Sequence, residues 1–300
     1  MKFDENLAAL HGYLCADGYV SKNLPHQKHK YYIIGLRNQN RTLLEDFQNK
    51  FYEIFKQRPK LIEHERCHMY SKEIYQQLIS LGPFHSANWA FPELPKHLLK
   101  FWLRAFFDCE GWVIARAGKD RRVAAESINH ESLSKLKTDL EQKFDIPSSI
   151  YLKKNRNISG LHIYGKENLV KFQKEIGFLH PEKNKKLSEA ISSFIDYNWT
   201  FPQDKKKRKS FLDNLIVERA KAKRPHTIRF SSIYLTNINT LANELFRTYN
   251  IKAKKYERKN GQGRMYFELA IYSEKEVKKL LNSRLLSKKQ ASKLVFKQNI

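Results

Sequence analysis

The chain has 300 residues, 41% hydrophobic and 13% aromatic, with a formal net charge of +25 at pH 7. Its aromatic content excludes a disordered chain, and its 3 cysteines lack the CxxC spacing typical of disulfide or zinc frameworks. No apolar run reaches the ~18 residues that a membrane span needs, and the first residues do not resemble a secretory signal. We therefore expect an intracellular protein without a membrane partner.

The first predicted helix carries a motif that returns 93 residues later without a gap, since Leu10 to Gly18 aligns with Leu103 to Gly111. Each copy begins with leucine, has small residues four positions apart (Gly12 and Ala16; Ala105 and Cys109), and ends with an acid and a glycine. Small residues at i and i+4 share a helix face and let two backbones approach closely. Gly18 and Gly111 can adopt a positive φ and end the helices. The two helices are predicted to pack side by side, with Asp17 and Glu110 together at their C-terminal ends.

Two neighbouring carboxylates at helix C-termini are unfavourable, because like charges repel and the helix dipole adds its negative end. A divalent cation would relieve this repulsion, and ligands that are all oxygen favour Mg²⁺. On a nucleic-acid-binding surface, this arrangement predicts metal-assisted phosphodiester hydrolysis, with two or more ions between Asp17 and Glu110. Ala16, Gly18, Cys109 and Gly111 are the predicted helix-end residues around that site.

Three short segments share a second pattern, in which a strand ends at Tyr70, Tyr164 or Tyr272 and an amphipathic helix follows. Asp17 precedes the first tyrosine by 53 residues and Glu110 precedes the second by 54. Amphipathic helices are predicted upstream at 43–55, 133–144 and 238–249, each followed by a hairpin. The chain therefore contains three repeats that read β, α, β, β, α.

The hairpins predict sheet faces that bind nucleic acid. In the third repeat, Met265, Phe267, Leu269 and Ile271 alternate onto the core side, joined through the Asn260-Gly261 turn to a basic strand. Arginine, lysine and asparagine on the opposite face can contact a DNA groove. A solvated sheet would show the same alternation, but the net charge favours binding. The predicted DNA-binding residues are Lys28, Lys30, Tyr151, Lys153, Asn155, Lys252, Lys254, Tyr256, Arg258, Arg264 and Tyr266.

The last third of the chain is the most basic, with a net charge of +17 for residues 201–300 against +8 for residues 1–200. It has no usable copy of the acidic motif. Counting 54 residues back from Tyr272 reaches Glu218, but Asp213 then occupies the close-packing position and Arg219 replaces the glycine. We expect residues 211–219 to form a linker helix after the lysine-rich run, and residues 226–300 to bind nucleic acid without cutting it.

The paired motifs resemble those of the LAGLIDADG homing endonucleases. The resemblance covers residues 1 to 195 as two tandem half-domains, so the chain is similar to the single-chain members. Leu103 to Gly111 is a close match, whereas Leu10 to Gly18 departs at His11 and Cys15. The resemblance implies an α+β fold of two pseudo-symmetric αββαββα half-domains forming a DNA-binding saddle, with Mg²⁺ between Asp17 and Glu110. The expected domains are 1–96, 97–198, and a basic linker with a third repeat at 199–300.

Together with the metal site expected between the acids, the resemblance implies a monomeric, site-specific endonuclease that breaks both strands of duplex DNA at a long site with Mg²⁺. The family also places basic residues around the metal ions, and Arg37, Arg116 and Lys119 are the candidates here. A metal site at residues 64–68 is disfavoured, since that segment alternates like a strand. Two alternatives stay open: a maturase that binds structured group I intron RNA, and a DNA-binding regulator that does not cleave. A prokaryotic cytoplasm or an organelle is the expected location.

Overall fold

The computed structural model describes residues 1–23, 31–116, 120–153, 156–194, 199–223, 225–259 and 265–294. They belong to two compact units, Met1–Phe194 and Ile195–Ile300, and each unit is described here by itself. The predicted residues Lys28, Lys30, Lys119, Asn155 and Arg264 lie outside the described residues. Within the described ranges, no helix is both long and apolar enough to cross a membrane.

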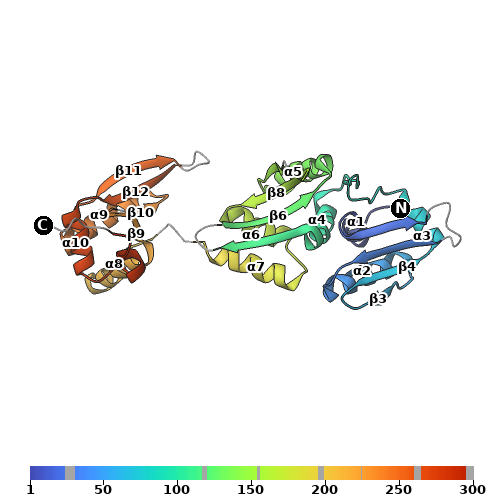
Figure 1. Cartoon of the computed structure of the whole chain (residues 1–300), viewed down its shortest axis with the longest axis horizontal. Helices are drawn as coiled ribbons and strands as arrows, with labels where there is room; N and C mark the ends of the chain where they lie inside the picture. Colours follow the sequence, from blue (N-terminus) through green and yellow to red (C-terminus); the bar gives the residue numbers. More distant parts are fainter. Residues whose placement is uncertain are drawn as a thin grey trace. The chain divides into compact units, whose positions relative to one another are not determined.

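The first unit consists of two half-domains with the same order of elements (Figure 1). The first contains α1 (Glu5–Cys15), β1 (Gly18–Lys22), β2 (Tyr32–Arg37), α2 (Arg41–Phe55), β3 (Lys60–Ile62), β4 (Arg66–Tyr70) and α3 (Lys72–Ile79). The second contains α4 (Lys96–Glu110), β5 (Gly111–Arg116), β6 (Asp120–Ser127), α5 (His130–Phe144), β7 (Ser149–Lys153), β8 (Ile158–Tyr164) and α6 (Lys166–Glu175), followed by α7 (Pro181–Ser192). The predicted α+β fold with two αββαββα half-domains is confirmed.

The second unit repeats this order. It contains α8 (Lys205–Arg219), β9 (Lys221–Lys223), β10 (Thr227–Ser232), α9 (Leu235–Tyr249), β11 (Lys254–Lys259), β12 (Met265–Ile271) and α10 (Glu274–Asn282), followed by α11 (Lys288–Ala291). The sheets of the described residues have equivalent strand orders, β1-β2-β4-β3, β5-β6-β8-β7 and β9-β10-β12-β11, and all pairs are antiparallel. The second unit is therefore built on the same plan as a half-domain.

Local sequence explains where the helices begin and end. The Asp4 carboxylate accepts a hydrogen bond from Leu7 N at 2.8 Å and caps α1, while Asn40 and Asn129 cap α2 and α5 in the same way. The residues that end α2, α5 and α9 are Lys56, Asp145 and Asn250, each in the left-handed conformation with φ between 51° and 54°. This recurring stop turns each chain segment into its second hairpin.

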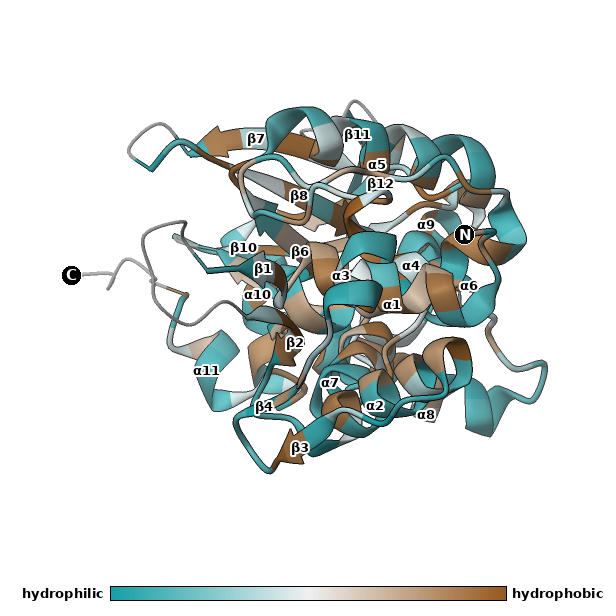
Figure 2. Cartoon of the chain, turned by 90° about the vertical axis from the view of Figure 1, so that its right-hand side faces the viewer, coloured by the Kyte–Doolittle hydropathy of each residue, from teal (hydrophilic) through white to brown (hydrophobic). Residues whose placement is uncertain are grey.

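One apolar core runs through both half-domains of the first unit, and a separate core fills the second unit. The α2 ribbon in Figure 2 carries both hydrophobic and hydrophilic residues, and its buried side chains are Leu43, Leu44, Phe47 and Phe51. In the second unit, Leu212, Leu215 and Ile216 of α8 are buried in the core with α9 and the sheet. The expectation of a linker helix at residues 211–219 is therefore wrong, because this helix contributes to the core of its unit.

The hairpin of the third repeat differs from the prediction in two places. Met265 is 46% exposed, because it begins β12 at the edge of the core rather than inside it. Lys252 precedes β11, and its backbone N–H donates to Glu276 Oε2 at 2.8 Å. Phe267, Leu269 and Ile271 do pack with the core, as predicted.

The contact between α1 and α4 generates the first prediction. A Cβ atom on Gly12 would lie 2.5 Å from Trp102 O, which is too close for any side chain. Gly12→Ala should therefore force the helices apart and destabilise the protein by about 1–3 kcal/mol in urea unfolding. Gly160→Ala is the control, because its Cβ would meet only side chains, at 3.3 Å or more. Equal stability of both variants would contradict this close packing.

Candidate active site and nucleic-acid interface

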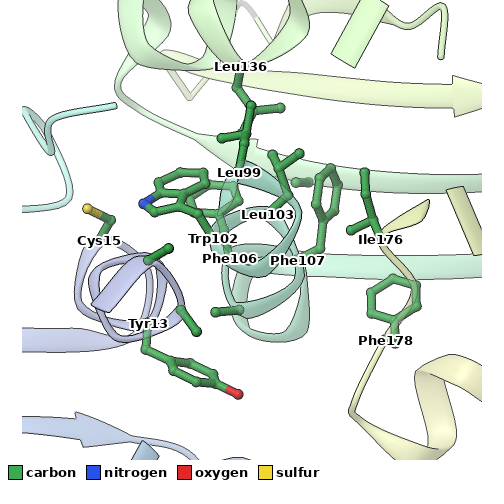
Figure 3. Close-up of a cluster of buried hydrophobic side chains, with 14 of the residues drawn as sticks. Tyr13, Cys15, Leu99, Trp102, Leu103, Phe106, Phe107, Leu136, Ile176 and Phe178 are labelled. Carbon is green, nitrogen blue, oxygen red and sulfur yellow. The ribbon is translucent and has the colours of Figure 1, made fainter. Parts of the chain in front are cut away.

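The candidate site is positioned by the packing of α1 against α4. Figure 3 shows the two helices side by side, with Trp102 reaching from α4 toward α1. Besides Gly12, the small residue Ala105 lies at the contact, 3.1 Å from where a Gly12 Cβ would be. The Trp102 indole Nε1 donates to His11 Nδ1 at 2.9 Å, and its ring stacks on Phe106. The close approach predicted from the small residues is therefore present.

The two acids follow directly from these helices. Ala16 is the residue after α1 and precedes Asp17, while Cys109 precedes Glu110, the last residue of α4. Extending the strand pairing by one residue sets Asp17 opposite Arg37 and Glu110 opposite Glu126. The two acids thus occupy equivalent positions in the two half-domains.

The glycines after the acids serve a different purpose from the one predicted. Gly111 is extended, with φ −84° and ψ 156°, and neither Gly111 nor Gly18 has a positive φ. A Cβ on Gly18 would lie 2.4 Å from Leu14 Cα, and one on Gly111 would lie 2.5 Å from Phe107 O. Glycine is required because the strand folds back against the last turn of its own helix.

The electrostatics of the pair are those of two interacting carboxyls. Burial and, to a smaller extent, the negative charge of Asp17 raise the pKa of Glu110 to about 7, against the opposing effect of the Lys183 ammonium. The Asn38 amide also donates a hydrogen bond to Asp17 Oδ2 at 2.9 Å. The pair is therefore partly desolvated, and the two acids interact through their charges.

Lys183 of α7 is the basic residue at this site, and the sequence interpretation missed it. Its Nζ donates to Phe107 O at 3.3 Å, to Asp108 O at 2.5 Å and to Cys109 O at 3.1 Å. These carbonyls end α4, so a cation offsets the negative end of that helix. Burial lowers the pKa of Lys183, while the charges of Asp17 and Glu110 act in the opposite direction. No local sequence motif predicts a role for this lysine, which lies 73 residues after Glu110.

Asp108 joins the same helix end to α7. Its two carboxylate oxygens accept hydrogen bonds from Leu179 N at 3.1 Å and His180 N at 2.9 Å. Cys15 is the equivalent residue in the first motif, and its buried thiol approaches Ala90 O at 3.7 Å instead. The departure at Cys15 therefore removes an anchoring acid, not one of the paired acids.

The other candidate basic residues are placed less closely. The Arg37 backbone N–H donates to Asp17 O at 3.2 Å, and its guanidinium lies 5.7 Å from the centre of the Tyr19 ring. Arg116 ends β5, five residues beyond Gly111, which is roughly 17 Å along a strand. Arg37 therefore lies next to Asp17, whereas Arg116 lies at the far end of β5 from Glu110.

The open sheet faces carry the predicted aromatic and basic residues. By strand register, Tyr151 and Lys153 lie on the open face of the second sheet, where Lys153 pairs with Glu126. Lys254, Tyr256 and Arg258 share a face of β11, with Tyr266 of β12 beside Arg258. Leu152, on the other face of β7, is 53% exposed because β7 is an edge strand. Both sheets therefore present charged and tyrosine side chains on the face away from the helices.

Two histidines on the open faces of the first and second sheets were not among the residues predicted from the sequence. His68 lies opposite Gly35 and His162 lies opposite Ala124, so they are equivalent residues of the two half-domains. Burial lowers the pKa of His162 to about 4, and the Arg122 charge acts in the same direction. His68 Nδ1, His162 Nε2 and Tyr19 Oη are buried and have no hydrogen-bond partner among the described residues. Each histidine stands two residues before a repeat tyrosine, which was the signal available in the sequence.

The second unit has an arginine where the half-domains have an acid. Extending the β9–β10 register reaches Arg219, the last residue of α8, and Arg219 precedes Tyr272 by the same 53 residues that separate Asp17 from Tyr70. The better structural equivalent of the acids is therefore Arg219, not Glu218. The acid pair has no third member in this unit.

The donor set around Asp17 and Glu110 suits a hard cation that is completed by other ligands. In the parts of the chain that the structure describes, no group of three or more histidine, cysteine, aspartate or glutamate residues could hold a metal ion. Two carboxylates are nevertheless sufficient protein ligands for Mg²⁺ where waters and a substrate phosphate supply the rest. The residues present fit an ion that binds together with a phosphodiester.

Residues 98–177 match the family described as LAGLIDADG-like domain. This match covers most of the second half-domain, and it confirms the resemblance drawn from the paired motifs. A curated protein, the replication factor C small subunit of Thermococcus kodakarensis, is 29% identical over 190 residues. The alignment covers 60% of this chain and 20% of that protein, so the chain spans about a fifth of the length of this relative.

Solved structures with a similar fold include I-DmoI in complex with DNA and Ca, at 15% identity and a TM-score of 0.47, covering 61% of this chain and 99% of that one. I-WcaI bound to its DNA recognition sequence is 18% identical with a TM-score of 0.44, covering 62% and 88% of the two chains. The N-terminal LAGLIDADG domain of DUF199/WhiA is 16% identical with a TM-score of 0.40, covering 59% and 86%.

The hydrogen bonds of Lys183 predict a specific loss of stability. Lys183→Met should remove a hydrogen-bond donor from three carbonyls at the end of α4, of which only Phe107 O keeps a backbone donor, the Gly111 N–H, and should lower the free energy of unfolding by about 2 kcal/mol. Lys186→Met, which removes an exposed lysine from the same helix, should have little effect. Urea unfolding of the two variants checks this, and equal stabilities would show that Lys183 does not anchor α4.

His11 predicts a loss of stability at acid pH. Burial lowers its pKa to about 4, so the folded state keeps His11 neutral while the unfolded state takes up a proton near pH 6.5. The stabilisation is fully present above pH 6.5, and His11 alone should remove about 2 kcal/mol as the pH falls from 8 to 5. NMR titration of the His11 ring should show no protonation above pH 5. A midpoint near 6.5 would contradict the buried, neutral ring.

Proposed function

We propose that this protein is a nuclease that hydrolyses phosphodiester bonds in duplex DNA at a specific, long site, with Mg²⁺ as its ion. The observation that carries the proposal is that Asp17 and Glu110 lie at the C-terminal ends of two closely packed helices and interact through their charges. A purely structural helix pair has no need of two partly buried acids at that point. The LAGLIDADG-like domain at residues 98–177 supports the same reaction class.

The side chains of this site have separate tasks in the proposed reaction. Asp17 and Glu110 would hold the divalent ion, which supplies Lewis-acid stabilisation of the negative charge that develops on the phosphate. Asn38 keeps the Asp17 carboxylate oriented through its 2.9 Å hydrogen bond. Lys183 and Asp108 fix the end of α4, so that Glu110 keeps its position when the repulsion between the acids changes.

The sheet faces would bind the duplex and select its sequence. His68, His162 and Tyr19 lie on these faces, and each has one buried polar atom without a hydrogen-bond partner among the described residues. Lysine and arginine on the same faces would neutralise phosphates. We further propose that the protein acts as a monomer inside the cell, because one chain contains both motif acids.

Substituting either acid tests the reaction. Asp17→Asn and Glu110→Gln should each lower the rate of duplex cleavage in Mg²⁺ by at least 10³-fold while keeping DNA affinity, because they remove charge and keep shape. Glu73→Gln, which neutralises an exposed acid on α3, is the control. The assay is cleavage of a library of duplex sites, with Ca²⁺ as the second ion. Cutting that persists in both variants, or binding without cutting in the wild type, would overturn the nuclease proposal, and preference for a group I intron RNA would favour a maturase.

The basic face of the second unit should contribute affinity but no chemistry. Lys254→Gln with Arg258→Gln should weaken duplex binding and lower the slope of log K against log salt by about 2. Lys288→Gln with Lys289→Gln on α11 removes the same charge outside the β11–β12 face and should change the slope less. Deleting residues 195–300 should likewise weaken binding. Unchanged affinity in the double variant and the deletion would show that this unit does not contact DNA.

A further inference from the structure

The first turns of α8 present a strongly basic surface to solvent. The helix begins Lys-Lys-Lys-Arg-Lys, from Lys205 to Lys209, and its first turn contains no acidic residue. All four lysines are exposed, and none of them has an ion pair within the described ranges of the chain. Asn214 stands where α1 has Gly12, so α8 lacks the small residue that lets α1 and α4 touch, and this side of the helix stays open.

Helix α9 adds to the same charge. The Glu244 carboxylate lies 3.4 Å from Arg208 Nε and 3.8 Å from Arg247 Nη1, so one acid pairs with two guanidinium groups. The Glu244 side chain is only 8% exposed, whereas that of Arg247 is 71% exposed. The α8 basic patch therefore consists of Lys205, Lys206, Lys207, Arg208, Lys209 and Arg247.

This arrangement of charge is unfavourable within the protein itself. The N-terminal end of a helix is the positive end of its dipole, so cations there are destabilising, and neighbouring lysines also repel one another. The Asp204 carboxylate already accepts a hydrogen bond from Lys207 N at 2.8 Å and caps the helix. The groups left to bind an anion are therefore the side chains of the patch, and a polyanion would relieve their repulsion.

The patch lies away from the sheet face that is proposed to bind duplex DNA. Because α8 has 15 residues, about 20 Å separates its first residues from Arg219, which leads into β9. Leu212 and Leu215 of α8 belong to the core on the inner side of the sheet, whereas Tyr256 and Arg258 lie on its other side. Figure 1 shows α8 and β11 at opposite sides of the second unit. One duplex lying on the sheet face would leave the patch uncovered.

The composition of the patch indicates the chemistry of its partner. Lysine ammonium groups are compact charges on flexible stems, so they suit a run of phosphates better than the edges of bases. A membrane surface is disfavoured, because Leu212, Leu215 and Ile216 are packed in the core and α8 has no apolar face to insert. A nucleic-acid backbone fits both observations.

We propose that the α8 basic patch binds the phosphate backbone of a second segment of duplex DNA, so that the second unit holds two segments, one on each side. Holding two segments requires the duplex binding by the sheet face that is proposed above, whereas the contact with α8 does not. Neither contact requires cleavage at Asp17 and Glu110.

The first test is the rate of lysine acetylation in the full-length protein, measured by mass spectrometry with and without saturating duplex DNA of mixed sequence. The duplex should slow acetylation of the α8 lysines at least threefold, and that of Lys254 on the sheet face to a similar extent. Lys288 and Lys289, which are exposed on α11, should change less than twofold.

The footprint separates this inference from the proposed function. Protection of Lys254 without the α8 lysines would overturn the second contact and leave duplex binding by the sheet face in place. Protection of the α8 lysines without Lys254 would support the α8 contact and contradict binding by the sheet face. Protection of neither group would contradict both.

Capture of a labelled duplex on beads that carry another duplex measures the holding of two segments. Lys206→Gln with Lys207→Gln and Lys209→Gln should reduce capture at least fivefold and keep the affinity for the bead-bound duplex within twofold. These substitutions remove cations from the positive end of a helix, so they should not lower the stability of the protein in urea unfolding.

The matched control removes the same charge from exposed lysines elsewhere in the second unit, as Lys275→Gln with Lys288→Gln and Lys289→Gln. It should capture the labelled duplex as the wild type does. Equal capture by the two triple variants would mean that α8 does not hold a segment. An equal loss of affinity for both duplexes in the α8 variant would mean that the patch extends the first contact, and it would also overturn the proposal.

Discussion

The close approach of α1 and α4 is the constraint on which the first unit depends. Gly12 leaves no space for a side chain next to Trp102 O, so the backbones touch and the two helices end at the same place. One continuous core joins the half-domains through this contact. The same contact also brings the acids together, because each acid lies at the C-terminal end of its helix. Stability and the candidate chemistry therefore come from one packing arrangement.

Bringing two acids to two helix ends has an electrostatic cost, and the fold offsets part of it. Burial and the charge of Asp17 raise the pKa of Glu110, while Lys183 acts in the opposite direction. Lys183 is held by the carbonyls of α4, and Asp108 ties the same helix end to the segment that begins α7. The offset is incomplete, which leaves the pair receptive to a cation that arrives with a phosphate.

The three repeats show how one topology serves different chemistry. All have equivalent strand orders, and their second helices end at a left-handed residue. The equivalent position at the end of the first helix nevertheless holds Asp17 in one repeat, Glu110 in the next and Arg219 in the third. Where the acid is replaced, the small residues are replaced as well, and the helix lines a cavity. Motif and packing surface have thus changed together.

Much of this protein could be predicted from its sequence, since the periodicity of small residues, acids and tyrosines reports local structure directly. The fold class, the helix pair and the polar sheet faces follow from such patterns. The tertiary structure alone decided that Lys183, 73 residues from Glu110, reaches the end of α4, because no local pattern encodes a contact between distant segments. It also decided that Gly18 and Gly111 are needed for space rather than for a positive φ, and that residues 211–219 belong to a core. Each of these outcomes depends on which surfaces meet after folding, and a single segment of sequence does not contain that information.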